Sequence, residues 1–289
     1  MKNAKRALSV FLCMLMLLLP LGLLSSAETG YEPGSKLVVL GDSIAAGEGA
    51  SDIAKSYAEL LRSARGFSLA NYAVGGHDSF QLMERLKDEE IRAAIAEADI
   101  INLSIGGNDL LHSEVIAALL RTVIKDFSLV EACLVPFREN FSAIVADIRG
   151  LNPDALFIVQ NVYNPMDDVP IVGGLYETVN VMLNDIYAEY LAANEGAFVL
   201  ADMHSAFAGR AGLVYADRIH PSDAGHALIA ELLTAIVDGA PLTPEPAPQS
   251  DPNFFETVVS FAQALVDYLS FWLSQMSVLE LIGKIFSFL

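Results

Sequence analysis

The chain has 289 residues, of which 53% are hydrophobic, so it can bury the core of a globular domain and is not a disordered chain. It carries 36 acidic and 17 basic side chains, for a formal net charge of −19 at pH 7. Such a surface repels phosphate backbones, which excludes nucleic acid as an expected partner. It also disfavours adsorption to anionic lipid through charge alone.

The N-terminal segment has the pattern of a cleaved secretory signal. Residues 2–6 include three basic side chains, residues 7–24 form an apolar run, and residues 25–27 are small. A retained membrane anchor is the alternative, because the apolar run approaches spanning length; Pro20 and the small residues favour cleavage. Removal of residues 1–27 leaves 14 basic and 36 acidic side chains, or −22, on a secreted or extracellular protein.

Cysteine usage excludes some kinds of site. The chain has two cysteines, and Cys13 lies within the predicted signal. Cys133 would then be the single cysteine of the mature protein, so an intramolecular disulfide and a cysteine metal cluster are both excluded.

Between residues 36 and 238, short apolar runs alternate with longer stretches of helical periodicity, which is typical of a parallel α/β sheet. We assign residues 28–238 to one such domain. The stretch 111–150 holds more helix than one crossover requires, so part of it is expected to form a lid or wall over a site. Predicted strands cover residues 36–40, 67–74, 99–105, 155–163 and 197–203. Predicted helices cover residues 55–64, 78–98, 114–127, 137–150 and 176–196, and another begins near Ser222.

The C-terminal part differs in composition from the domain. Residues 239–253 are rich in proline, as in an extended linker, and residues 254–289 are apolar except for one narrow polar stripe at helical spacing. The longest uncharged run of this amphipathic helix, 268–279, is too short to span a bilayer. We expect it to bind a membrane surface or to self-associate; a helix folded back onto the domain is nearly as well supported.

A serine stands where the first predicted strand turns into a glycine-rich segment, in "LVVLGDSIAAGEGA" at residues 37–50. Ser43 would lie at the carboxyl edge of the sheet, where open α/β folds bind their ligands. From this segment alone, Ser43 is equally well explained as a helix N-cap. A nucleophilic serine needs a base, an acid that orients the base, and donors for an oxyanion, so the partners must decide.

The sequence "YADRIHPSDAGH" offers the base and the acid. Asp217 and His220 are three residues apart in a loop before a helix, so the carboxylate can bond one imidazole nitrogen while the other faces outward. Taken alone, Asp217 could be a cap and His220 an ordinary loop histidine.

Two glycine turns offer the oxyanion donors. "SIGGNDL" places Asn108 directly after a buried strand, and "NYAVGGHDS" places Gly75 and Gly76 after another. Each is also consistent with a simple tight turn. His77 either lines the pocket or is solvated.

These four segments resemble, in order and spacing, the SGNH or GDSL hydrolase family over roughly residues 35–237. The resemblance implies a three-layer α/β/α fold with a five-stranded parallel, flavodoxin-like sheet, and hydrolysis of carboxylic esters without a metal or organic cofactor. It implies Ser43 as nucleophile, His220 as base and Asp217 as orienting acid. It also implies an oxyanion hole of Ser43, Gly76 and Asn108, with Gly76 favoured over Gly75 from the spacing to Asn71.

Competing functions are less well supported. The segment after the first strand lacks the endings of a P-loop and of a dinucleotide-binding turn, which argues against a phosphate binder. A non-catalytic surface module on the same fold would not need a complete triad. Fold does not choose among ester substrates; the apolar C-terminal helix favours lipid or acyl esters, and a carbohydrate O-acetyl esterase is the alternative.

Overall fold

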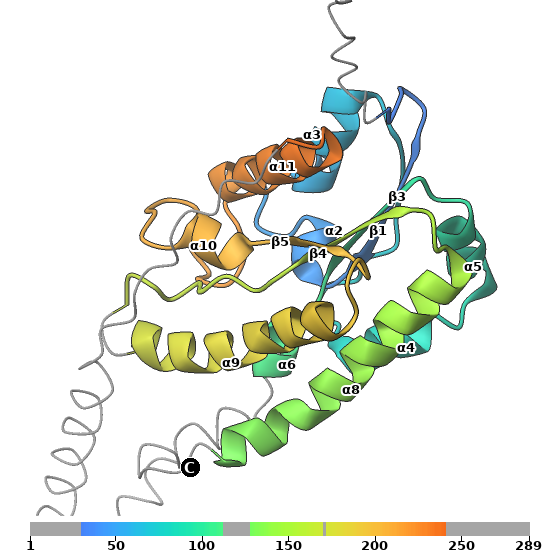
Figure 1. Ribbon diagram of the computed structural model, residues 1–289. Helices are drawn as coiled ribbons and strands as arrows, with labels where there is room; N and C mark the ends of the chain where they lie inside the picture. The colour runs from blue at the N-terminus through green and yellow to red at the C-terminus, as the bar shows by residue number, and fades with distance from the viewer. Residues whose placement is uncertain (1–29, 112–127, 170–171, 241–289) are drawn as a thin grey trace, which may run out of the picture.

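A five-stranded parallel sheet forms the middle layer of the molecule (Figure 1). The computed structural model describes residues 30–111, 128–169 and 172–240. All four neighbouring strand pairs are parallel, and the order is β2-β1-β3-β4-β5. This is the flavodoxin-like order, so the predicted fold class is confirmed. The strands are β1 (Lys36–Gly41), β2 (Ser68–Asn71), β3 (Ile100–Ser104), β4 (Leu156–Gln160) and β5 (Val199–Ala201).

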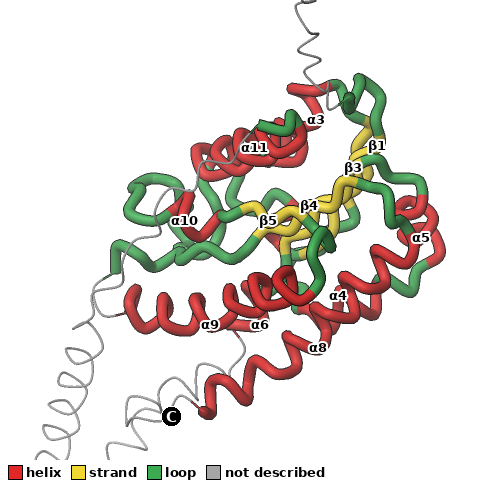
Figure 2. Tube along the Cα trace, viewed as in Figure 1, coloured by secondary structure: helices red, strands yellow, loops and turns green. Residues whose placement is uncertain are grey.

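Helices cover both faces of the sheet (Figures 1 and 2). Successive side chains of a strand point to opposite faces, so Leu37 and Val39 pack on one side and Val38 and Leu40 on the other. One layer contains α3 (Tyr57–Arg65) and α11 (Asp223–Val237). The other contains α4 (Ser79–Arg85), α5 (Glu89–Ala96), α8 (Ser128–Leu151) and α9 (Val172–Ala193). Each layer buries its own apolar core against the sheet.

Four short helical segments complete the described fold. Two of them directly follow strands at the carboxyl edge and carry predicted site residues: α2 (Ser43–Ala46) after β1 and α6 (Gly107–Leu111) after β3. The others are the 3₁₀ turn η1 (Ile53–Lys55) and α10 (Met203–Phe207). Because β1 and β3 are neighbours, and the chain runs from β1 outward in both directions, α2 and α6 meet at the topological switch point of the sheet.

Several predicted boundaries were wrong, each for a local reason. β2 ends at Asn71, three residues early, because that side chain accepts from the Ala73 amide and donates to the Ala45 carbonyl. The single helix predicted over residues 78–98 is two helices, because the Asp88 side chain caps a new one at the Glu90 amide.

Other differences concern helices that were predicted too short or missed. α8 begins well before residue 137, and α10 was not predicted; its N-cap is Asp202, which accepts from the Ser205 amide. The predicted helix over residues 114–127 lies outside the described residues, as do the predicted signal 1–27, the helix 254–289 and most of the linker 239–253. Of the helices that the structure describes, none combines the length and apolarity needed to cross a bilayer.

Candidate active site

Ser43 is held at the start of α2 by the backbone of the strand that precedes it. Gly41 has φ +133° and lies so close to β3 that a Cβ there would come within 1.8 Å of the Ser104 carbonyl oxygen. The next residue, Asp42, donates its amide to that carbonyl and accepts from the Ile44 amide at 3.1 Å, as the N-cap of α2. The N-cap explanation for Ser43 is therefore wrong, because Asp42 fills that position.

Ser43, His220 and Asp217 form one continuous hydrogen-bonded chain. His220 Nδ1 lies 2.7 Å from Asp217 Oδ2, and His220 Nε2 lies 2.9 Å from Ser43 Oγ. An ionised carboxylate only accepts, so Nδ1 carries the proton and Nε2 accepts from the Ser43 hydroxyl. Residues 177 positions apart in the sequence thus have the geometry of a nucleophile, its base and the group that orients the base.

The loop that carries Asp217 and His220 is closed by backbone bonds at its base. The Tyr215 amide donates to the His220 carbonyl at 2.8 Å, and the Ser222 amide donates to the Leu213 carbonyl at 2.7 Å. From the segment that follows β4, the hydroxyl of Tyr163 donates to the Ile219 carbonyl at 2.6 Å. The tip is nevertheless exposed. These few bonds fix where the imidazole lies.

Asp217 does more than bond the imidazole. Its Oδ1 accepts from the amides of Ile219 and His220 at 3.0 and 3.1 Å, so the side chain also shapes the turn. Partial burial acts to raise the pKa of Asp217, but the bonds from the His220 ring and from these two amides outweigh it and hold the pKa below its ordinary value. The carboxylate is therefore ionised at neutral pH, as an orienting acid requires.

The buried Asp42 differs from Asp217 in its protonation. Burial raises the pKa of Asp42 to about 7, against the lowering effect of the Ile44 and Ala45 amides and the Ser104 hydroxyl. Nearby Asp109 acts in the same direction as burial. Near neutral pH this carboxyl is thus poised between its charged and neutral forms, directly beside Ser43.

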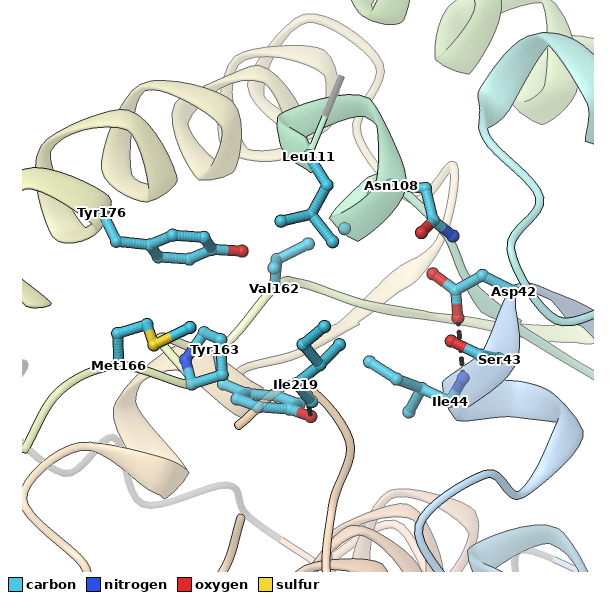
Figure 3. A pocket seen from close by; sticks show the side chains of 12 residues that line it. Asp42, Ser43, Ile44, Asn108, Leu111, Val162, Tyr163, Met166, Tyr176 and Ile219 are labelled. Atoms are coloured by element: carbon cyan, nitrogen blue, oxygen red, sulfur yellow. Dashed lines mark hydrogen bonds between the residues drawn. The ribbon is translucent and has the colours of Figure 1, made fainter. Parts of the chain in front are cut away.

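Asn108 lies on α6, next to Ser43 at the pocket (Figure 3). The sequence after β3 was also consistent with a simple tight turn, but the segment is the start of this short helix. Asn108 Nδ2 donates one hydrogen to the His77 carbonyl at 2.8 Å, which fixes the amide group and leaves its second hydrogen for a ligand. The His77 side chain is not among those that line the pocket.

The two glycine turns are joined to each other by side chains. Asp109 accepts from both the amide and the hydroxyl of Ser79, at 3.0 and 2.6 Å, so α6 is tied to the residues after the Gly75–Gly76 turn. Gly76 has φ +79°, and a Cβ there would meet nothing within 4 Å. A Cβ on Gly75 would come within 1.9 Å of Glu48 Oε1. Gly76 is the more open of the two toward a ligand.

An apolar pocket has Ser43 and Asn108 at its polar end (Figure 3). Its walls come from five separate parts of the chain, which meet only in the fold. The lining side chains beyond the polar end are Ile44, Leu111, Val162, Tyr163, Pro165, Met166, Tyr176 and Ile219. Across the described residues, no group of three or more histidine, cysteine or carboxylate side chains is arranged to hold a metal ion.

Sequence reasoning missed three side chains that shape the site. Glu48 places a carboxylate oxygen 3.4 Å from His220 Nε2, and its own carbonyl accepts from the buried His226 ring. Tyr163 supports the His220 loop, and Asp109 joins the two glycine turns. Glu48 and Asp109 stand in quoted segments, but only the three-dimensional fold shows what the three side chains contact.

A flavodoxin-like sheet with serine, histidine and aspartate joined at its carboxyl edge, beside an asparagine and a glycine turn, defines the SGNH class of hydrolases. The chain belongs to the GDSL-like lipase/acylhydrolase family, whose model matches residues 39–228. The resemblance inferred from the four segments is thus confirmed, and the family is one of ester hydrolases.

Relatives agree with this assignment. The chain is 29% identical over 246 residues to the uncharacterized protein YpmR of Bacillus subtilis, covering 78% of this chain and 94% of that one. It is 24% identical over 207 residues to the spore germination lipase LipC of Bacillus licheniformis, covering 68% and 93%. The crystal structure of the lipase Lip_vut3 from a goat rumen metagenome has the same fold, with a TM-score of 0.60, 22% identity, and coverage of 70% and 96%.

Proposed function

We propose that this protein is an exported serine esterase that hydrolyses carboxylic esters, with a preference for lipid or acyl esters, through an acyl intermediate on Ser43. The observation that carries the proposal is the unbroken chain from Asp217 through His220 to Ser43, at 2.7 and 2.9 Å. That chain gives the serine a base already in hydrogen-bonding contact.

In the first half of the reaction, Ser43 Oγ attacks the ester carbonyl carbon while His220 Nε2 takes the hydroxyl proton. The bond from carbon to the alcohol oxygen then breaks, and His220 gives its proton to that oxygen, so the alcohol leaves neutral. In the second half, water attacks the acyl group on Ser43, with His220 again as base, and the acid and the free serine are released. Asp217 stabilises the imidazolium at each step.

Three donors are available for the oxyanion that forms on the carbonyl. Ser43 is the first residue of α2, so its amide has no partner within that helix. The second hydrogen of Asn108 Nδ2 and the amide of Gly76 complete the set. Donors fixed in advance in this way are typically worth about 10²–10³ in rate each.

The pocket beside Ser43 is suited to the acyl group of the ester. The pocket that opens at Ser43 and Asn108 is lined by apolar side chains, which suits an acyl chain. The name of the relative LipC, a lipase, supports the same substrate class. Secretion rests on the signal pattern of residues 1–27, and association with a cell or membrane surface rests on the amphipathic pattern of residues 254–289.

The decisive experiment is labelling of the full chain with a fluorophosphonate, followed by peptide mapping. We expect the label on Ser43, with hydrolysis of 4-nitrophenyl butyrate lost by about 10³-fold or more in Ser43→Ala. An unlabelled protein, or a Ser43→Ala variant that keeps more than a few per cent of the rate, contradicts the mechanism. Such a result would favour an inert surface module.

Substrate preference is tested separately. Rates on esters of increasing acyl length are expected to exceed the rate on acetylated xylan, because a chain longer than acetyl fills the apolar pocket. A faster rate on the acetylated glycan would instead make the protein a carbohydrate O-acetyl esterase. Sequencing the N-terminus of protein from the culture medium checks export, and flotation with liposomes checks surface binding.

A further inference from the structure

The carboxylate of Glu48 lies beside the catalytic histidine, and the proposed mechanism has no use for it. Its carboxylate Oε2 lies 3.4 Å from His220 Nε2, and half of its side chain is exposed. On the other side, Oε1 lies against the Gly75 backbone. The carboxylate therefore stands beside the catalytic imidazole, between the His220 loop and the glycine turn.

The backbone of Glu48 is firmly placed. Its amide donates to the Ser43 carbonyl at 2.9 Å, and its carbonyl accepts from His226 Nε2 at 3.0 Å. The neighbouring Gly49 packs so closely on the His220 segment that a Cβ there would come within 2.2 Å of the Pro221 carbonyl oxygen. The fold therefore fixes the backbone of Glu48 beside the His220 segment, within reach of the imidazole.

In the resting state Glu48 and His220 Nε2 do not form a hydrogen bond with each other. Nε2 accepts from the Ser43 hydroxyl and carries no proton, and a carboxylate can only accept, so no hydrogen bond joins the two atoms. Among the described ion pairs, none brings a lysine or arginine to this carboxylate. Its oxygens are thus open to a donor on a bound molecule.

The proposed mechanism determines which part of the substrate lies beside Glu48. His220 Nε2 must give its proton to the departing alcohol oxygen, so that oxygen lies within hydrogen-bonding distance of Nε2. A carboxylate 3.4 Å from the same nitrogen then lies next to the alcohol and not next to the acyl group. The apolar pocket, whose lining does not include Glu48, is left for the acyl chain.

We propose, on the basis of the esterase function above, that Glu48 selects esters of polyols by accepting a hydrogen bond from a second hydroxyl group next to the ester oxygen. The same charge disfavours alcohols that carry a carboxylate or phosphate. Glycerol esters and sugar esters share this chemistry, whereas esters of simple alkanols lack it. The acyl end is then recognised by apolar contact and the alcohol end by charge.

The test compares the wild type with Glu48→Gln and Glu48→Leu on 1-monobutyrin, methyl 6-O-butyryl-glucoside and propyl butyrate, by titrating the acid released. We expect the wild type to prefer at least one polyol ester over propyl butyrate by about tenfold in kcat/KM. Glu48→Leu should bring that ratio close to one, and Glu48→Gln, which keeps an acceptor without the charge, should fall between. Which polyol ester is preferred identifies the natural alcohol.

The ratio of kcat/KM values is compared because a general effect on His220 would change the rates on all three substrates equally. Glu231→Gln, a similar loss of charge on an exposed position of α11, is the matched control and should leave the ratio unchanged. The proposal is overturned if Glu48→Leu keeps the wild-type ratio, or if the wild type shows no polyol preference. Failure of the esterase function is a distinct result, in which no ester is hydrolysed through Ser43.

Discussion

The two halves of the triad are built in opposite ways. Ser43 is buried, follows a central strand, and is fixed by backbone contacts that begin at Gly41. Asp217 lies on an exposed loop whose position depends on a few bonds from outside it. The difference teaches that the nucleophile is part of the core, so disturbing it should cost stability, whereas disturbing the loop should cost mainly activity.

Of the variants on the loop side, Asp217→Asn should lose the most activity. Asparagine keeps an oxygen for the Ile219 and His220 amides but cannot accept the Nδ1 proton as a carboxylate does, so the favoured tautomer is lost. We expect kcat/KM to fall about 10²–10⁴-fold with the melting temperature nearly unchanged. Asp223→Asn, in a nearby surface ion pair with Lys55, is the control and should keep most activity. Equal losses in both variants would refute the role of Asp217.

On the buried side, Gly41→Ala should destabilise the whole domain. The new Cβ would meet a backbone oxygen at 1.8 Å, where no side chain can give way, so we expect a loss of about 3 kcal/mol or more in the free energy of unfolding. Gly196→Ala is the control, since its φ is +77° but nothing lies within 4 Å. It isolates the cost of the backbone conformation, about 1 kcal/mol. Urea unfolding measures the free energy of unfolding of both variants. Similar losses would argue against the close approach of Gly41 to the Ser104 carbonyl oxygen.

The proton on Asp42 should make stability depend on pH. Its pKa is about 7 in the fold and 3.8 without the fold, so the folded state holds a proton that the unfolded state releases. The stabilising contribution is present below pH 4 and is lost as pH rises through about 7; it amounts to at most about 4 kcal/mol. His204, whose pKa is raised chiefly by its bond to Glu177, acts in the same direction.

Asp42→Asn separates these two contributions, because it keeps the acceptor for the Ile44 amide and removes only the titrating group at this position. Melting temperatures at pH 5 and pH 8 should differ less in the variant than in the wild type. An unchanged difference would show that Asp42 does not titrate in this range.

The smallest effect should come from Tyr163→Phe, which removes the bond to the Ile219 carbonyl. We expect a loss of about 1 kcal/mol in stability and about a tenfold loss in kcat/KM, because the His220 loop is less well placed. Tyr57→Phe removes a comparable hydroxyl, bonded to Asn102 at 2.8 Å in the core, and should lower stability without that loss of activity. If both variants lose activity alike, Tyr163 has no positioning role.

The contrast between the buried core and the exposed loop also explains which features could be predicted from the sequence. Apolar runs such as residues 36–40 and 99–105 define strands by composition alone, and glycine, serine, asparagine and histidine segments mark the ends that meet at one edge. The end of β2 at Asn71 and the break at Asp88 depend on single side chains that bond nearby backbone, so periodicity does not reveal them.

The roles of some side chains depend on contacts between distant segments. These roles could not be predicted from the sequence for a different reason. Glu48 lies near His220 where Gly49 packs on the Pro221 backbone, and Tyr163 contacts Ile219 from the segment after β4, 56 positions away. Neither contact leaves a local pattern. The raised pKa of Asp42 likewise comes chiefly from burial under the whole fold, which the amides of the neighbouring Ile44 and Ala45 only partly offset.

The separation of Ser43 and His220 by 177 positions also governs when hydrolysis can begin. During synthesis the nucleophile emerges early, while its base follows only after almost the whole domain has been made. A nascent or proteolytically shortened chain that ends before residue 217 holds an inert hydroxyl group. Formation of the hydrogen-bonded triad is thus coupled to completion of the domain.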